Sequence, residues 1–321
     1  MSLSLEDLDR ITHIFLPYTE LKTREVTSSG GRFVYYTTAE TATSILRNKQ
    51  FWMRNTAAMN DYLEVEHGFE CLNASYASSP GIALNAALNT CFSDLAVEVQ
   101  DFFYEWLPSI RRDTYITCMS EHLRSEDQHG RLSMWRAYGE RTGVALVLNG
   151  AVMVRKSTEP VLNIFSSPVA YLNPEDFGAE VEKIANNIVT EVDYIKSLGR
   201  ETVKQTVFQM LRFAVLCTKH PGFHEEKEWR VIASPVMHPS QHANFAVEVI
   251  RGTPQEVLRV DLKNHPGLVG LALPELLDRI IIGPCQFPNM VGAAFRRLLQ
   301  EVGVPEAEKK IIISDIPLRQ P

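Results

Sequence analysis

The strongest constraint on the fold is a helical pattern that spans residues 174–219. Apolar residues recur there every three or four positions, as expected for amphipathic helices. The segment "SLGRE" at 197–201 divides the pattern into two helices. The two apolar stripes consist of Phe177, Val181, Ile184, Ile188, Val192 and Ile195, and of Val203, Val207, Leu211 and Val215.

Strands are predicted on both sides of this block, because aromatic and β-branched residues cluster in short segments. Helices are expected at 4–16, over most of 59–110, at 132–138 and at 290–303. Thr37 and Glu40 have the spacing of a capping box, which predicts that a further helix begins there. This order is not a regular alternation of strand and helix, so we expect an α+β fold. A single domain, 1–321, is predicted, with a mixed sheet core and helical insertions at 62–110 and 174–219. The predicted strands are 33–37, 51–55, 114–120, 144–148, 161–171, 226–232, 246–250, 257–262, 279–284 and 309–314.

Composition narrows the class of protein. The net charge of −7 does not indicate an extended nucleic-acid-binding surface. The five cysteines are far apart and form no C-x-x-C pair, which argues against a disulfide framework or a cysteine zinc site. The start of the chain lacks the pattern of a signal peptide, and no run approaches the roughly 18 apolar residues of a membrane span. We therefore expect a cytoplasmic protein without a membrane partner.

The familiar catalytic motifs are absent. There is no G-x-x-x-x-G-K-[ST], G-x-G-x-x-G, G-x-S-x-G or H-E-x-x-H. His220 and His224 have the spacing of two metal ligands on a helix, but Pro221 and Gly222 between them would break that helix. No metal site is predicted.

Two patches place polar side chains where core building does not require them. Tyr35-Tyr36-Thr37-Thr38 lies between a strand and a helix, where free backbone N–H groups suit an anionic or ribose-bearing ligand. The alternative is a buried aromatic strand with a threonine cap. Asn60 and Asp61, with Glu64, form the second patch, for which helix capping is the simpler interpretation.

A third patch runs from Ser120 to Tyr138. Trp135 and Tyr138 are three positions apart and would be neighbours on a helix. They would form an aromatic wall for a base or a nicotinamide ring. The alternative is that they belong to the core.

The fourth patch is "HEEKEWRVIA", residues 224–233. In a strand, Glu226, Glu228 and Arg230 would point one way, and the mostly apolar set that includes Trp229 and Val231 would form the core face. On an open surface the charged set would be an ion-pair cluster that adds little stability. In a cleft, Glu228 would be an acid–base or cation-stabilising group that Arg230 orients.

Together these patches resemble the domain of unknown function 2971 family of bacteria and phages. The resemblance spans residues 33–284 and depends on five segments that occur in order: "YYTTAETATSILRNKQF", "MNDYLE", "MSE" with "MWRAYGERTGVALVL", "KHPGFHEEKEWRVI" and "IIIGP". Gly139 replaces a small residue such as alanine in that pattern. The fourth segment adds Lys219, His220 and Glu226 to the candidate site residues.

The layout is more distantly similar to ADP-ribosyltransferases. That resemblance implies NAD as cofactor, an unknown macromolecular acceptor, and a role in phage defence or a toxin system. By position it implies that Glu228 is catalytic and that Tyr36, Thr37, Ser120 and Tyr138 bind NAD. It implies cofactor-binding positions for Trp135 and Arg230 as well. A fixed carboxylate would stabilise the positive charge that develops on the ribose.

Two other functions stay open. One is a non-catalytic module that binds a nucleotide or a partner protein. The other is a metal-dependent nucleic-acid-processing enzyme that uses Asp61, Glu64 and Glu226, since carboxylate oxygens suit Mg²⁺.

Overall fold

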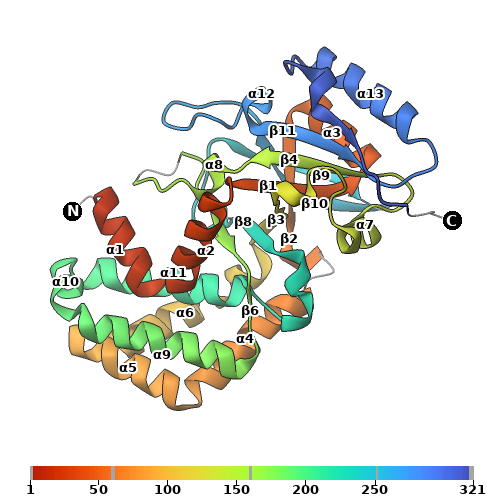
Figure 1. Cartoon of the computed structure of the whole chain (residues 1–321). Coiled ribbons are helices and arrows are strands. Elements are labelled where there is room, and N and C mark those ends of the chain that lie inside the picture. The colour runs from red at the N-terminus through yellow and green to blue at the C-terminus, as the bar shows by residue number, and fades with distance from the viewer. Residues whose placement is uncertain (1–2, 59–61, 159–160, 251, 318–321) are drawn as a thin grey trace.

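The chain folds as an α+β protein in which a helical body lies beside a large mixed sheet (Figure 1). This computed structural model describes residues 3–58, 62–158, 161–250 and 252–317. The expected fold class is therefore confirmed. No helix within these ranges is long and apolar enough to cross a membrane.

Within these described ranges the sheet contains ten strands, and all their pairings are antiparallel except that of β11 with β12. One path through it runs β12-β11-β4-β1-β3-β2-β10-β9, and β8 and β5 extend it from the other edge of β3. The strands are β1 (Arg32–Thr38), β2 (Gln50–Asn55), β3 (Tyr115–Glu121), β4 (Gly143–Asn149), β5 (Ile164–Pro168), β8 (Glu228–Ala233), β9 (Ala243–Ile250), β10 (Thr253–Asp261), β11 (Leu277–Ile282) and β12 (Ile311–Ile313). A separate parallel pair consists of β6 (Ala170–Tyr171) and β7 (Thr218–Lys219).

Strand β3 lies at a fork in the sheet. Its carboxyl end pairs with β1 through Val34 and Ser120, whereas its amino end pairs with β2 through Arg54 and Ile116. The other edge of β3 pairs with β8 along nearly its whole length, including Ser120 with Glu228. The fork brings side chains from three distant parts of the chain onto one face of the sheet.

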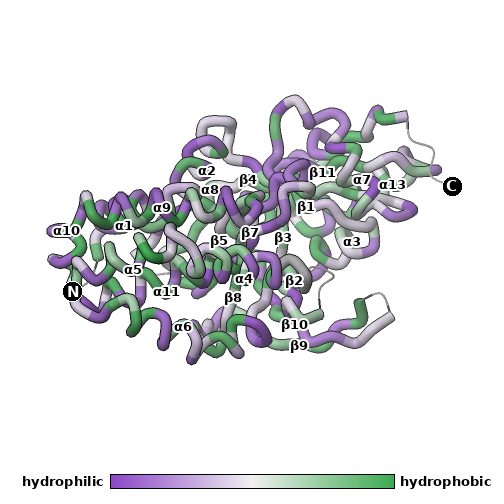
Figure 2. The backbone as a smooth tube through the Cα atoms, turned by 90° about the horizontal axis from the view of Figure 1, so that it is seen from below, coloured by the Kyte–Doolittle hydropathy of each residue, from purple (hydrophilic) through white to green (hydrophobic). Residues whose placement is uncertain are grey.

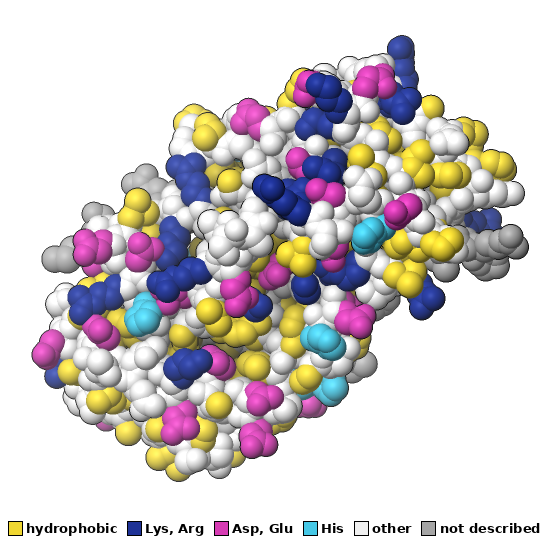
Figure 3. Space-filling model, viewed as in Figure 1, with side chains coloured by type: hydrophobic (Ala, Val, Ile, Leu, Met, Phe, Trp, Pro, Cys, Tyr) yellow, Lys and Arg dark blue, Asp and Glu magenta, His cyan; other side chains and the backbone are white. Residues whose placement is uncertain are grey.

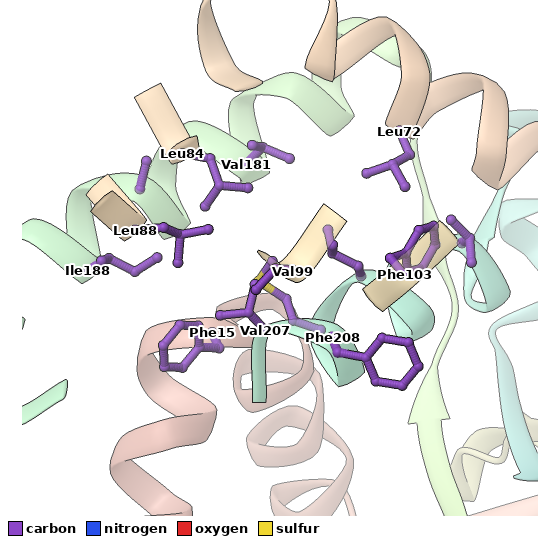
Figure 4. Packing of buried hydrophobic residues seen from close by; sticks show 14 of the residues in the cluster. Phe15, Leu72, Leu84, Leu88, Val99, Phe103, Val181, Ile188, Val207 and Phe208 are labelled. Carbon is purple, nitrogen blue, oxygen red and sulfur yellow. The ribbon is translucent and has the colours of Figure 1, made fainter. Parts of the chain in front are cut away.

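The helical body covers one face of β3 and β8. Its apolar stripes share one buried cluster with Ile116 and Ile232 of the sheet, and the labelled side chains of Figure 4 point into the space between the helices. The predicted insertions at 62–110 and 174–219 thus pack on each other. The helices of the body are α1 (Leu5–Phe15), α4 (Tyr62–Tyr76), α5 (Ser79–Cys91), α6 (Leu95–Arg112), α9 (Pro174–Thr190), α10 (Val192–Ser197) and α11 (Arg200–Leu216).

The remaining helices lie around the sheet. Figure 2 shows, from below, the helical body on one side and the sheet with its β9–β10 hairpin on the other. A second buried cluster joins the sheet face that carries Phe33 and Trp229 to α3 and α13. These helices are α2 (Pro17–Ser28), α3 (Ala39–Asn48), α7 (Leu132–Tyr138), α8 (Ala151–Val154), α12 (Leu273–Leu276) and α13 (Pro288–Glu301), and the 3₁₀ segments are η1 (Thr56–Ala58), η2 (Arg124–Glu126), η3 (Pro221–Glu226) and η4 (Ala307–Lys310).

Most predicted elements form where expected, with a few corrections. Thr38, not Thr37, caps α3, because β1 continues one residue further and pairs Thr38 with Gly143. The block at 174–219 contains three helices, because the chain breaks at Glu191 as well as near Gly199. The strand predicted at 161–171 is divided into β5 and β6.

Candidate functional site

The two faces of β8 have different environments. Trp229 joins the apolar cluster beneath α3 and α13, whereas Glu228 and Arg230 point to the face that the helical body covers. Glu226 was expected in the same strand, and this prediction is wrong. Glu226 ends the 3₁₀ segment η3, and Lys227 then takes a left-handed backbone conformation that turns the chain into β8.

Four charged side chains nevertheless meet at this turn, and we call Lys219, Glu226, Glu228 and Arg230 the charged quartet. Lys219 Nζ donates to Glu226 Oε2 at 2.6 Å and to Glu228 Oε2 at 3.1 Å. Arg230 Nε donates to the other oxygen of Glu228 at 2.7 Å. Two positive and two negative charges therefore balance one another in a largely dry site.

Local structure holds the quartet in place. Arg230 also donates to the carbonyl of Leu216 at 2.5 Å, at the end of α11, where the helix dipole favours a cation. Lys219 comes from β7, which pairs with Tyr171, and the Tyr171 hydroxyl accepts a 2.8 Å hydrogen bond from the backbone N–H of Glu228. The short strand pair β6–β7 therefore positions the lysine over the first residue of β8.

The two carboxyl groups have opposite pKa shifts. Burial alone would raise the pKa of Glu228, but Arg230 and Lys219 beside it lower that pKa to about 2. Burial raises the pKa of Glu226 above its ordinary value, and Lys219 only partly opposes this. Glu228 is 6% exposed, whereas the side chain of Glu226 is 19% exposed and is the more accessible acid. Carboxyl groups with separated pKa values are typical of acid–base sites.

Arg131 connects the quartet to the rest of the site. Its guanidinium donates to the carbonyls of Glu225 and Glu226 at 2.9 and 3.1 Å, and to the carbonyl of Glu121 at 2.9 Å. Its backbone N–H donates to the hydroxyl of Tyr36 at 2.8 Å. One residue thus joins η3, β1 and the carboxyl end of β3.

The predicted ligand-binding residues of β1 and β3 are all buried. Ser120 lies directly opposite Glu228 in the ladder, on the face that also carries Tyr36. Tyr36 is 6% exposed, and burial raises the pKa of its hydroxyl. Thr37 is also buried, and it points to the opposite face of β1. The structure therefore brings Tyr36 and Ser120 to the face of Glu228 but does not bring Thr37 there.

The expected aromatic wall is incomplete. Trp135 is 1% exposed and packs edge-to-face on Tyr36, with ring centroids 4.8 Å apart. Tyr138, on the same helix, is 38% exposed. Helix α7 packs against η3, which carries the exposed ring of Phe223. Phe223 is therefore an exposed ring beside the quartet, with Lys219 Nζ 4.7 Å from its centroid, and Tyr138 is an exposed ring on the helix that contacts η3.

The other candidates have separate positions. His220 is exposed, and its Nδ1 accepts a hydrogen bond from the backbone N–H of Gly222 at the start of η3. Asn60 and Asp61 lie outside the described residues, as does the side chain of Glu64. Among the residues that the structure does describe, no three His, Cys, Asp or Glu side chains form a group that could hold a metal ion.

Sequence reasoning missed Arg131 and Tyr171. The sequence around Arg131 does not predict its role, because no local pattern indicates that the residue before α7 reaches η3. Tyr171 stands in a segment that was predicted as a strand, but its contact with the backbone of Glu228 depends on tertiary packing.

Figure 3 shows acidic and basic side chains interspersed across the face of the molecule where the helical body meets the sheet.

A large cavity lies on the opposite face of the sheet. It has a volume of about 720 Å³, and Trp229 and Val231 contribute to its lining. Tyr36, Ser120, Tyr138 and Glu228 do not line it. The charged quartet and this cavity are therefore two separate sites on either side of β8.

The comparisons with known proteins identify one family. Residues 134–231, from α7 into β8, match the family described as "Protein of unknown function (DUF2971)". This match supports the family resemblance over residues 134–231, a smaller span than the 33–284 over which the motifs occur. No curated protein and no solved structure matches the chain. The more distant resemblance to ADP-ribosyltransferases stays a prediction.

Proposed function

We propose that this chain, whose residues 134–231 match the DUF2971 family, is an ADP-ribosyltransferase-like enzyme that modifies a protein or a nucleic acid. One observation carries the proposal: Lys219 bridges Glu226, at the end of η3, and Glu228, which lies on the sheet face that also carries Tyr36 and Ser120. Two carboxyl groups in different environments are typical of active sites that catalyse glycosyl transfer.

The reaction that we propose breaks one bond and forms one. NAD supplies ADP-ribose: the bond between C1′ of its ribose and nicotinamide breaks, nicotinamide leaves as a neutral molecule, and the acceptor forms a bond to C1′. The site has to stabilise positive charge on the ribose and to take the proton that the acceptor loses. Phe223 and Tyr138, at 45% and 38% exposure, present ring faces on which a nicotinamide or adenine ring stacks.

The two glutamates have different tasks in this proposal. Glu228 is fixed by two cations and stays ionised, so it holds Lys219 in position beside Glu226. Glu226 is partly exposed and carries the raised pKa, so it is the group that takes the proton of the acceptor. Lys219 holds both carboxylates in one geometry, which makes it a positioning residue.

Nicotinamide release from NAD by the purified protein tests the proposal. Glu226→Gln keeps the shape of the side chain but removes the base, and we expect kcat to fall at least ~100-fold. Glu225→Gln is the matched control, because Glu225 is the exposed neighbouring carboxylate, and its activity should equal that of the unaltered protein. Thermal unfolding of each variant confirms that the fold is retained.

Other results would contradict the transferase proposal. Full activity in Glu226→Gln would remove Glu226 from the chemistry. NAD binding in calorimetry without turnover, across protein and nucleic-acid acceptors, would indicate a binding module instead. Activity that a chelator abolishes would indicate a metal-dependent enzyme.

The pH profile gives a second prediction. A base must be ionised to act, so activity should fall as the pH decreases through the pKa of Glu226. Because burial raises that pKa, the acidic limb should lie above pH 4.5, the ordinary value for glutamate. The measurement is kcat/KM as a function of pH. If the residual activity of Glu226→Gln shows the same acidic limb, that limb belongs to another titrating group.

A further inference from the structure

The cavity on the opposite face of the sheet has the size of a small-molecule site. Its volume of about 720 Å³ falls within the range of ligand pockets in proteins. Its floor is formed by β5, β8, β3, β2 and β10, which are neighbours in that order. At about 4.8 Å between strands, the floor extends about 19 Å, which suits a long ligand.

The two ends of the cavity differ in polarity. Over β2 and β10 its lining is apolar, and includes Phe51, Met53, Val260 and Leu262. Near β5 it carries the hydroxyl of Ser166, which is buried and has no hydrogen-bond partner among the residues that the structure describes. Both α2 and α8 contact β5, so the polar end lies beneath these two helices.

Charged residues of the cavity lining set its electrostatic balance. Lys156 pairs with Asp9 at 2.6 Å, and Arg24 pairs with Glu20 at 2.6 Å. Arg155, directly after α8, is exposed and forms no ion pair with any residue that the structure describes. The lining therefore carries one uncompensated positive charge beside α8.

We propose that this cavity binds an amphiphile with one long apolar chain and an anionic head, such as a long-chain fatty acid. The chain lies across the apolar floor toward β10. The head lies at the β5 end, where Arg155 neutralises it and the Ser166 hydroxyl donates a hydrogen bond. This proposal is independent of the transferase proposal, because it concerns the other face of β8.

A fluorescent fatty acid, cis-parinaric acid, tests the proposal in a titration without NAD. We expect saturable binding of one probe per chain and displacement by palmitate. Arg155→Glu should weaken binding about tenfold or more, since it replaces an attractive charge with a repulsive one. Arg47→Glu is the matched control, because Arg47 is an exposed arginine of α3 that does not line the cavity, and its affinity should not change.

Two further experiments distinguish binding of the anionic head group from binding of the apolar chain of the ligand. Val152→Trp, which places a large ring on the wall formed by α8, should abolish binding while circular dichroism stays unchanged. A neutral long-chain alcohol should compete equally well in Arg155→Glu and in the unaltered protein. The proposal is overturned if no saturable binding occurs, if Arg155→Glu binds as tightly as Arg47→Glu, or if Val152→Trp binds normally.

Discussion

Replacing Glu228 with glutamine is expected to lower the free energy of unfolding by about 3–5 kcal/mol, the cost of removing one partner from a buried ion pair. Lys219 and Arg230 would then retain their charges at 2% and 1% exposure after losing a carboxylate that lies 3.1 and 2.7 Å from them. Urea unfolding measures the change. Glu225→Gln, an exposed substitution three residues earlier, should change stability by less than about 0.5 kcal/mol.

The same carboxylate should make the protein sensitive to acid. The pKa of Glu228 falls from 4.5 to about 2 on folding, so its contribution is fully present above pH 4.5 and is lost as the pH falls toward 2. Glu226 acts in the opposite direction, because a raised folded-state pKa favours the folded protein at low pH. Urea midpoints between pH 5 and pH 2 should decline less steeply in Glu228→Gln, and equal slopes would contradict this assignment.

This stability role changes how the catalytic proposal should be tested. Loss of activity in Glu228→Gln would not separate catalysis from damage to the fold, because the substitution removes one charged partner from each of two buried cations. Glu226 is a better probe, since it is only partly buried and ends a 3₁₀ turn. A small stability change in Glu226→Gln together with a large loss of kcat would support the assigned roles.

Replacing Trp135 with alanine is expected to cost about 3–5 kcal/mol of stability, as for other large aromatic residues in cores. Trp135 packs on Tyr36, and its indole N–H donates to the carbonyl of His129 at 2.7 Å. The measurement is urea unfolding, with Arg136→Ala on the exposed face of the same helix as the control.

Two glycines next to Trp135 allow a sharper test of this packing. A Cβ atom at Gly283 would lie 2.8 Å from the indole ring, and one at Gly143 would lie 3.0 Å from it. Gly283→Ala should therefore destabilise the protein, and it should cost less when Trp135 has been replaced with phenylalanine. If Gly283→Ala lowers the free energy of unfolding equally with Trp135 and with phenylalanine at that position, the indole ring does not require glycine at position 283.

The outline of the fold could be predicted from the sequence, because it depends on local patterns. The apolar stripes of α9 and α11 repeat at the helical period, and the short, mostly β-branched runs of β4 and β11 are typical of buried strands. Helix α2 was not predicted, because polar residues occur all around it and only Val26 is buried. Glu226 was misplaced because the left-handed Lys227 has no signal in the residues around it.

The candidate site was only partly predictable. The sequence by itself determined that Glu228, Trp229 and Arg230 alternate between two faces of a strand, because side-chain direction in a strand follows from residue order. Only the tertiary structure decided which face each would meet. The fork at β3 sets Ser120 opposite Glu228, and the packing of β7 and α11 brings Lys219 and the Leu216 carbonyl to the charged side chains. Those contacts join residues far apart in the chain, and their geometry comes from packing rather than from any local pattern.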